Sequence, residues 1–261
     1  MIKMAGALFP LERKRLQKKT EEAKKAGRVS ALLFLEEEMN ALEGADCFFF
    51  YGSRWFPKAL LTVFFPDEEH GEITVAEFKE TKSGLTELFR CAIDTCRRAG
   101  VEKLYTVRNP ENGFSFEKIA GISFVCEWTE FLLCAETEML AGLKTGRDSG
   151  EIRVQKELAE EQDGTFRYCL TVNGTEAAEC RILSPEEGRQ CYLFGLKTKE
   201  AFRRQGLATR LIREIAGEYA KVPGMRMCLQ VSSKNEPAER LYRKLGFRTE
   251  EWREYYKTEE C

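Results

Sequence analysis

The sequence contains a single histidine, His70, and its 10 cysteines include no C-x-x-C pair. Structural zinc sites and thiol catalysis usually need histidines or paired cysteines, so these shortages argue against a metal centre and a cysteine nucleophile. Most of the cysteines lie inside apolar runs, where a free thiol behaves as a small hydrophobic side chain. We therefore expect reduced, structural cysteines and no bound metal.

Long apolar runs and an excess of one charge are also missing. The run 59–65 is strand-sized, far below the ~20 residues that span a bilayer. Residues 1–10 lack the apolar core of a signal peptide. The formal net charge of −2 provides no field that would attract nucleic acid. We expect a cytoplasmic protein that binds neither membrane nor nucleic acid.

A basic segment, residues 13–28, is the one feature that could suggest an RNA or acidic partner. Glutamates interleave with its lysines and arginines, and no aromatic side chains accompany them as base-stacking platforms. A solvated helix face is the better interpretation.

The chain is long enough for two packed domains. Its 261 residues exceed the usual single-domain size, and 43% of them are hydrophobic. The polar, glycine-rich stretch 142–150 is the best linker candidate. We predict a first domain over 1–141, a linker over 142–150 and a second domain over 151–261.

A glycine-containing turn in the second half lies between an apolar strand, 191–196, and an amphipathic helix that starts near Leu207. Such a turn offers free backbone N–H groups and the positive end of a helix dipole, which together favour an anion. A plain strand–helix connection is the alternative.

Downstream residues favour the anion site. A second strand, 227–231, leads to Asn235, a short helix and then Gly246-Phe247. The joint pattern R-x-x-G-x-A followed by N-x-x-A-x-x-L-Y-x-x-L-G-F resembles the GNAT superfamily of N-acetyltransferases, over about residues 166–256. The resemblance implies an α/β fold, more closely an α+β mixed sheet flanked by helices.

The resemblance also implies acetyl-CoA as cosubstrate. Its pyrophosphate would lie on the turn, and its pantetheine arm would contact the preceding strand and Asn235. For Asn235 the competing interpretation is a helix cap. The implied cofactor residues are Leu196, Lys197, Thr198, Arg203, Arg204, Gln205, Gly206, Leu207, Ala208, Thr209 and Asn235.

Tyr242 matches the family tyrosine that protonates the departing CoA thiolate, although a core aromatic is the competing interpretation. The general base has no clear candidate, because Gln190 and Gln230 stand where the family often carries a carboxylate. Water, a group from the first half, an amine that arrives neutral, or a nearby carboxylate all stay open. The carboxylates considered are Glu186, Glu187 and Glu200.

The first half repeats this arrangement without its polar residues. Gly84 precedes Gly206 by 122 positions and Gly121 precedes Gly246 by 125, which suggests an internal duplication. Thr81 stands where Arg203 is expected. Phe116 is the nearest counterpart of Tyr242, and it carries no hydroxyl. We predict two GNAT-like lobes, of which the first is a degenerate copy that either shapes a substrate cleft or supports its partner.

The predicted activity is direct transfer of acetyl from acetyl-CoA to an amine. The acceptor could be a small molecule, a peptide terminus or a protein lysine, and a homodimer is left open. A non-catalytic protein that binds or senses acyl-CoA is the main alternative. An interaction scaffold is a second one.

Overall fold

The computed structural model describes residues 2–4, 10–30, 47–53, 55–65, 67–81, 83–101, 103–116, 119–144, 150–159, 164–183 and 189–258. The chain forms two compact units. The first comprises residues 1–129 together with 252–261, and the second comprises residues 130–251.

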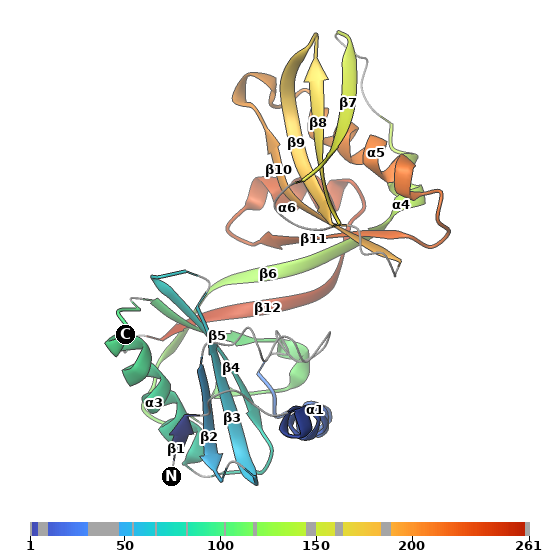
Figure 1. The fold of residues 1–261 in the computed structure, drawn as a ribbon. Helices are drawn as coiled ribbons and strands as arrows, with labels where there is room; N and C mark the ends of the chain where they lie inside the picture. The colour runs from blue at the N-terminus through green and yellow to red at the C-terminus, as the bar shows by residue number, and fades with distance from the viewer. Residues whose placement is uncertain are drawn as a thin grey trace. The chain divides into compact units, whose positions relative to one another are not determined.

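The first unit is built on a mixed sheet in the order β1-β2-β3-β4-β5-β12 (Figure 1). In the described strand pairs of this unit, β4 and β5 are parallel and the others antiparallel, and α3 connects the parallel pair. The elements are β1 (Ile2–Met4), α1 (Pro10–Lys25), β2 (Cys47–Gly52), β3 (Pro57–Phe64), β4 (His70–Glu77), α3 (Gly84–Arg98), β5 (Lys103–Arg108), the 3-10 helix η1 (Pro110–Asn112) and most of β12 (Arg248–Thr258).

Helices α1 and α3 cover opposite faces of this sheet. The predicted apolar face of α3, which includes Leu85, Leu88 and Phe89, is fully buried against Ile73 and strands β2 and β3. Burial of each such side chain contributes roughly 1.5–3 kcal/mol. On the other face, Leu16 of α1 packs with residues of β2, β3 and β4.

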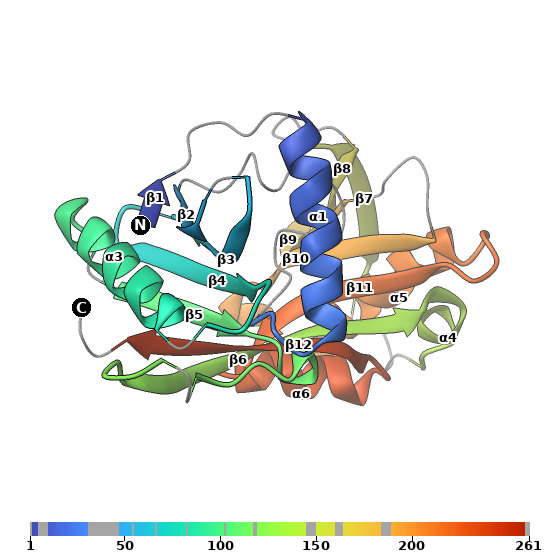
Figure 2. The same ribbon diagram turned by 90° about the horizontal axis from the view of Figure 1, so that it is seen from below.

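The second unit repeats the arrangement with the sheet order β6-β11-β10-β9-β8-β7 (Figure 2). In its described strand pairs, β10 and β11 are parallel and the others antiparallel, and α5 connects the parallel pair. The elements are β6 (Phe124–Glu136), α4 (Thr137–Ala141), β7 (Ile152–Leu158), β8 (Thr165–Val172), β9 (Thr175–Leu183), β10 (Gln190–Thr198), the 3-10 helix η3 (Glu200–Phe202), α5 (Leu207–Tyr219), β11 (Arg226–Ser232) and α6 (Glu236–Lys244).

The halves of the sequence exchange their last strands. β6 follows the first βαβ segment along the chain, yet it pairs with β11 over the full length Arg226–Ser232. β12 ends the second half and pairs with β5 of the first unit. The boundary between the compact units therefore falls within β6 and β12 and not at residues 142–150. Residues 145–149 of that predicted linker lie outside the described residues.

One expectation about the cysteines is wrong. Cys134 and Cys228 form a disulfide between β6 and β11. They lie directly opposite each other in the antiparallel register, with Cα atoms 4.2 Å apart, which brings their sulfur atoms together. The cysteines at 91, 96, 126, 169, 180 and 191 form no disulfide. Within the described residues, no helix is both long enough and apolar enough to cross a bilayer.

Candidate functional site

A cavity of about 760 Å³ opens in the second unit between β9, β10, the turn that precedes α5, and α6. It brings together every cofactor and catalytic residue predicted from the sequence except Gln205. The lining residues are Glu176, Ala178, Glu179, Leu196, Lys197, Thr198, Lys199, Glu200, Phe202, Arg203, Arg204, Gly206, Leu207, Ala208, Thr209, Asn235, Pro237, Ala238, Leu241 and Tyr242. Their individual roles stay predictions.

The turn before α5 has the backbone geometry of an anion site. Arg204 and Gly206 both adopt left-handed conformations, with φ values of 61° and 78°. Arg210 donates to the Gly206 carbonyl at 2.9 Å in the first helical bond, so the N–H groups of residues 207–209 have no acceptor inside the helix. A Cβ added at Gly206 would meet nothing within 4 Å. The space above this turn is open to a ligand.

Two side chains stabilise the turn itself. Arg203 donates from Nε to the carbonyl of Thr198 at 3.3 Å, which fastens the turn to the end of β10. Gln205 donates from Nε2 to the carbonyl of Ala201 at 3.1 Å, and it does not line the cavity. Arg203 therefore has a structural role in holding the turn.

β10 and β11 separate beside the cavity. Their parallel pairing runs from Gln190 to Tyr192, while β10 continues to Thr198 and β11 to Ser232. The register of β10 against β9 shifts between Phe194 and Lys197, around a glycine with positive φ. The cavity side of residues 196–198 therefore presents backbone groups at a fork between two strands.

Asn235 and Tyr242 both have the structural role that the sequence allowed, and both line the cavity. Asn235 caps α6, because its side-chain oxygen accepts from Ala238 N at 3.4 Å, and it also lines the cavity. Tyr242 is 7% exposed and packs edge-on against Phe247, with ring centroids 5.7 Å apart. Burial raises the pKa of the Tyr242 phenol to about 12. Tyr242 is a core residue whose side chain also borders the cavity.

Of the three carboxylates considered as a general base, the structure describes one, Glu200. Gln190 accepts from the Tyr192 hydroxyl at 3.1 Å, and Gln230 is an exposed residue of β11; neither lines the cavity. Glu200 does line it. Glu186 and Glu187 lie outside the described residues.

Sequence reasoning missed the contribution of β9. An irregularity in the β8–β9 register lets Glu176 and Glu179 both reach Arg167, whose Nη2 donates to them at 3.0 and 2.8 Å. Lys199 approaches Glu176 at 3.4 Å. Hydrogen bonding from Arg167 lowers the pKa of Glu176, so this carboxylate is a weak base. The alternation of a single strand gives no sign of such a bulge.

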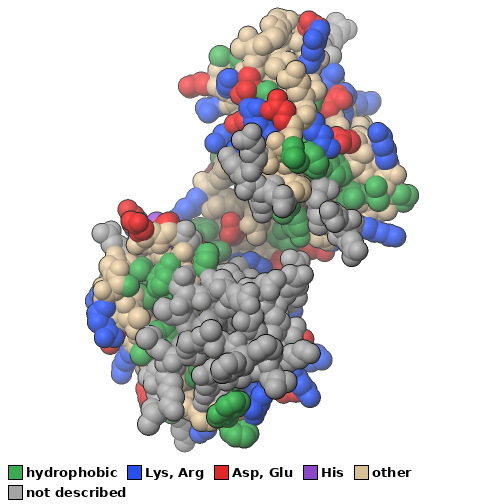
Figure 3. Space-filling view, viewed as in Figure 1, with side chains coloured by type: hydrophobic (Ala, Val, Ile, Leu, Met, Phe, Trp, Pro, Cys, Tyr) green, Lys and Arg blue, Asp and Glu red, His purple; other side chains and the backbone are tan. Residues whose placement is uncertain are grey.

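Basic and acidic side chains are interspersed over the face of the second unit that Figure 3 shows. In the cavity itself, the basic lining residues Lys197, Arg203 and Arg204 favour an anion together with the turn.

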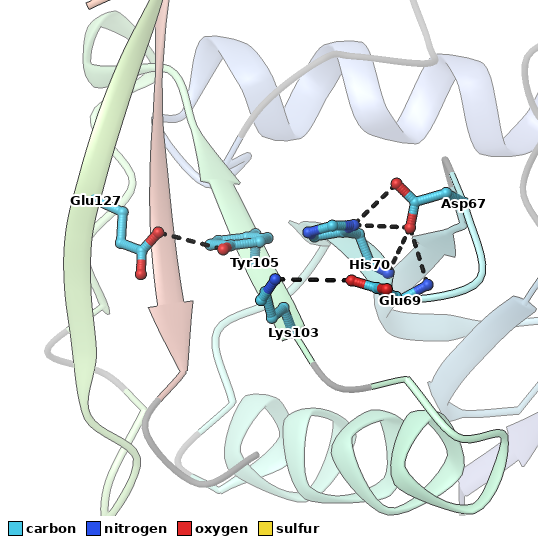
Figure 4. A network of polar contacts seen from close by, with 6 residues as sticks. All are labelled: Asp67, Glu69, His70, Lys103, Tyr105 and Glu127. Atoms are coloured by element: carbon cyan, nitrogen blue, oxygen red, sulfur yellow. Dashed lines mark hydrogen bonds and ion pairs between the residues drawn. The ribbon is translucent and has the colours of Figure 1, made fainter. Parts of the chain in front are cut away.

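The first unit holds a separate polar network around the single histidine (Figure 4). His70 Nδ1 lies 2.7 and 2.8 Å from the two carboxylate oxygens of Asp67, and the His70 ring stacks on Tyr105 at 6.1 Å. The Tyr105 hydroxyl donates to Glu127 at 3.2 Å, and burial is the main cause that raises the Tyr105 pKa to about 12. An ion pair completes the network, with Nζ of Lys103 3.8 Å from Oε2 of Glu69. In this network the Asp67 carboxylate anchors the imidazole beside β4.

Comparisons with known proteins agree with this architecture. Residues 173–257 match the family model of the FR47-like proteins. A tandem GNAT protein from the clavulanic acid biosynthesis pathway superimposes with a TM-score of 0.68 at 10% identity, and the match covers 98% of each chain. No curated protein matches the sequence.

Two further solved structures share the fold. A GCN5-related N-acetyltransferase from Sphaerobacter thermophilus has a TM-score of 0.66 at 11% identity, covering 98% of this chain and 95% of its own. A GNAT-family acetyltransferase from Colwellia psychrerythraea has a TM-score of 0.58 at 14% identity, covering 99% and 98%. Both units thus have the GNAT-like architecture predicted from the sequence.

Proposed function

We infer that this chain, a member of the GNAT superfamily, transfers the acetyl group of acetyl-CoA to an amine at the cavity of its second unit. One observation carries the proposal. The same cavity is bordered by the open start of α5, by the fork between β10 and β11, and by the buried side chain of Tyr242, which carries a hydroxyl group. These three features match the anionic, amide-rich and thioester parts of one ligand.

Each part of acetyl-CoA has a counterpart among these features. Its pyrophosphate would accept from the N–H groups of residues 207–209, with Arg204 beside it. Its pantetheine amides would pair with the backbone of residues 196–198 at the fork. A volume of about 760 Å³ lies within the range of cofactor sites.

The reaction would be a direct transfer. The amine nitrogen forms a bond to the thioester carbonyl carbon, the carbon–sulfur bond breaks, and the sulfur leaves as a thiolate that takes up a proton. Tyr242, with a pKa of about 12, is protonated at neutral pH and can donate to the sulfur. A thiol has a pKa of ~8.5, so complete proton transfer from the phenol would be uphill by about 5 kcal/mol. We therefore assign Tyr242 the role of hydrogen-bond donor to the developing thiolate.

The acceptor amine must lose a proton before or during attack. Glu176 and Glu179 on the cavity wall pair with Arg167, whereas Glu200 does not, which makes Glu200 the first base candidate to test. A water molecule could take the proton in place of a carboxylate, and an amine that arrives neutral would need no base to attack.

A non-catalytic acyl-CoA-binding or sensing protein is the second candidate. It is favoured by the glutamines at 190 and 230 and by the engagement of Glu176 and Glu179 with Arg167. Release of CoA thiol from acetyl-CoA in the presence of a broad amine panel separates the two. Turnover with any amine supports the acetyltransferase, whereas tight binding of acetyl-CoA with no turnover on the panel supports the sensor.

A further inference from the structure

The first unit contains a counterpart of the fork that borders the cavity. The parallel pairing of β4 and β5 begins at His70 and ends at Ile73, while β4 continues to Glu77. Counted from the first paired residue of each strand, Ala76 of β4 corresponds to Leu196 of β10. The backbone around Ala76 in the first unit can therefore be compared with the backbone around Leu196 in the second unit.

In the first unit, a segment that follows α1 lies in this fork. Val29 forms an antiparallel bridge with Ala76. Ser30 N donates to the carbonyl of Val75 at 2.9 Å, and Glu77 N donates to the carbonyl of Arg28, also at 2.9 Å. Val29 and Ser30 are both 0% exposed.

Ser30 also reaches the other branch of the fork. Its carbonyl accepts from the N–H of Asn109, the residue directly after β5, at 2.5 Å. Its hydroxyl oxygen accepts from Val75 N at 3.0 Å. The backbone groups that a pantetheine arm would need at this place are thus already hydrogen-bonded to the chain itself.

The start of the helix is closed as well. A Cβ added at Gly84, the first residue of α3, would lie 2.6 Å from Cδ1 of Tyr51 and 2.7 Å from Oγ1 of Thr81. Gly206, the N-cap of α5, has a φ of 78° and nothing within 4 Å of an added Cβ. Side chains of Tyr51 and Thr81 therefore crowd the start of α3, whereas the start of α5 is open.

A carboxylate of the chain lies next to this closed position. Glu77 is 0% exposed, and its carboxylate accepts from Thr81 N at 2.8 Å, three residues before α3. A pyrophosphate brought to the start of α3 would meet both a steric block and a negative charge. The same approach in the second unit meets Arg203 and Arg204.

We propose that the first unit is a self-occupied copy of the cofactor site, filled by residues 28–30 and Tyr51, so that the chain binds one acyl-CoA molecule, in the second unit. The location of that one molecule rests on the function proposed above. The closure of the first unit rests on its own contacts and can be tested separately.

Calorimetric titration of the full chain with acetyl-CoA tests the stoichiometry. We expect one equivalent for the wild type and at least ~100-fold weaker binding for Gly206→Trp, equivalent to about 2.7 kcal/mol. Gly174→Trp is a matched control, because Gly174 has a φ of 76°, has nothing within 4 Å of an added Cβ, and lies outside the cavity. It should keep one equivalent. Two equivalents in the wild type, or one full-affinity equivalent left in Gly206→Trp, would overturn the proposal.

Hydrogen exchange tests the closure without relying on binding. The amides of Ser30, Glu77 and Asn109 should be protected before acetyl-CoA is added and unchanged afterwards, whereas residues 206–209 should gain protection. Fast exchange of the three amides in the free protein would overturn the closure. If the wild type bound no acetyl-CoA at all, the proposed function would fail, and slow exchange of these amides would still support a closed first unit.

Discussion

At the scale of single residues, Tyr242 has two roles, one in the packing of the core and one in the proposed reaction. Its ring belongs to the core of the second unit, and its burial is the cause of the raised phenol pKa. The same burial keeps the proton on the hydroxyl at every pH at which the protein would work. Packing and proposed chemistry therefore depend on one side chain.

Removal of the Tyr242 hydroxyl separates the packing role from the proposed catalytic role. Tyr242→Phe preserves the ring, so we expect an unchanged affinity for acetyl-CoA and a kcat about 100-fold lower, the lower end of general acid contributions. Steady-state kinetics with an accepted amine measure both values. An unchanged kcat would remove Tyr242 from the mechanism.

The raised pKa also predicts how stability depends on pH. An unfolded tyrosine ionises near pH 10, whereas folded Tyr242 ionises near pH 12. The contribution of Tyr242 is thus complete below pH 10 and is lost as pH rises to 12, by up to about 3 kcal/mol. Urea unfolding of the wild type and Tyr242→Phe between pH 9 and 12 should show a steeper loss in the wild type. Parallel curves would contradict the assigned pKa.

At the scale of elements, the start of α6 has a structural and a proposed binding role in the same residue. Asn235 satisfies Ala238 N and borders the cavity. A substitution that keeps the cap but changes the side chain can tell the two roles apart.

Two substitutions at Asn235 make this comparison. Asn235→Ala should lower the free energy of unfolding by about 1 kcal/mol, because Ala cannot cap the helix, while Asn235→Ser should keep most of the stability. If the side chain contacts the CoA arm, both variants should bind acetyl-CoA more weakly. Full affinity in Asn235→Ser would restrict the residue to its capping role. Thermal unfolding and calorimetry give the two readouts.

Local patterns predicted the elements around the site well. The apolar spacing of α3 and α5 matched their buried faces, and the glycine turn matched the start of α5. These features depend on residues within one or two helical turns of each other, which a sequence displays directly. The ion-paired glutamates of β9 depend on a bulge and were missed.

At the scale of the whole molecule, the exchange of β6 and β12 decides which pieces of the chain can fold. A fragment of residues 151–261 retains β11 but lacks β6, its partner along Arg226–Ser232. That fragment would expose an unpaired strand edge and part of its core.

We therefore expect fragment 151–261 to unfold without cooperativity, and to regain a cooperative transition when mixed with fragment 1–150. Circular dichroism under reducing conditions isolates the strand pairing from the Cys134–Cys228 disulfide. A cooperative transition of fragment 151–261 alone would show that β6 is dispensable.

The sequence by itself determined the family resemblance, the two related halves and part of the cavity lining, from the Gly206 turn to Tyr242. Those signals are local, because a turn, a cap and an amphipathic helix are each specified by residues a few positions apart. Only the tertiary structure decided the strand exchange, the disulfide across 94 residues, and the filling of the first fork by residues 28–30. Each depends on hydrogen bonds and packing between segments distant in the chain, which no local periodicity encodes.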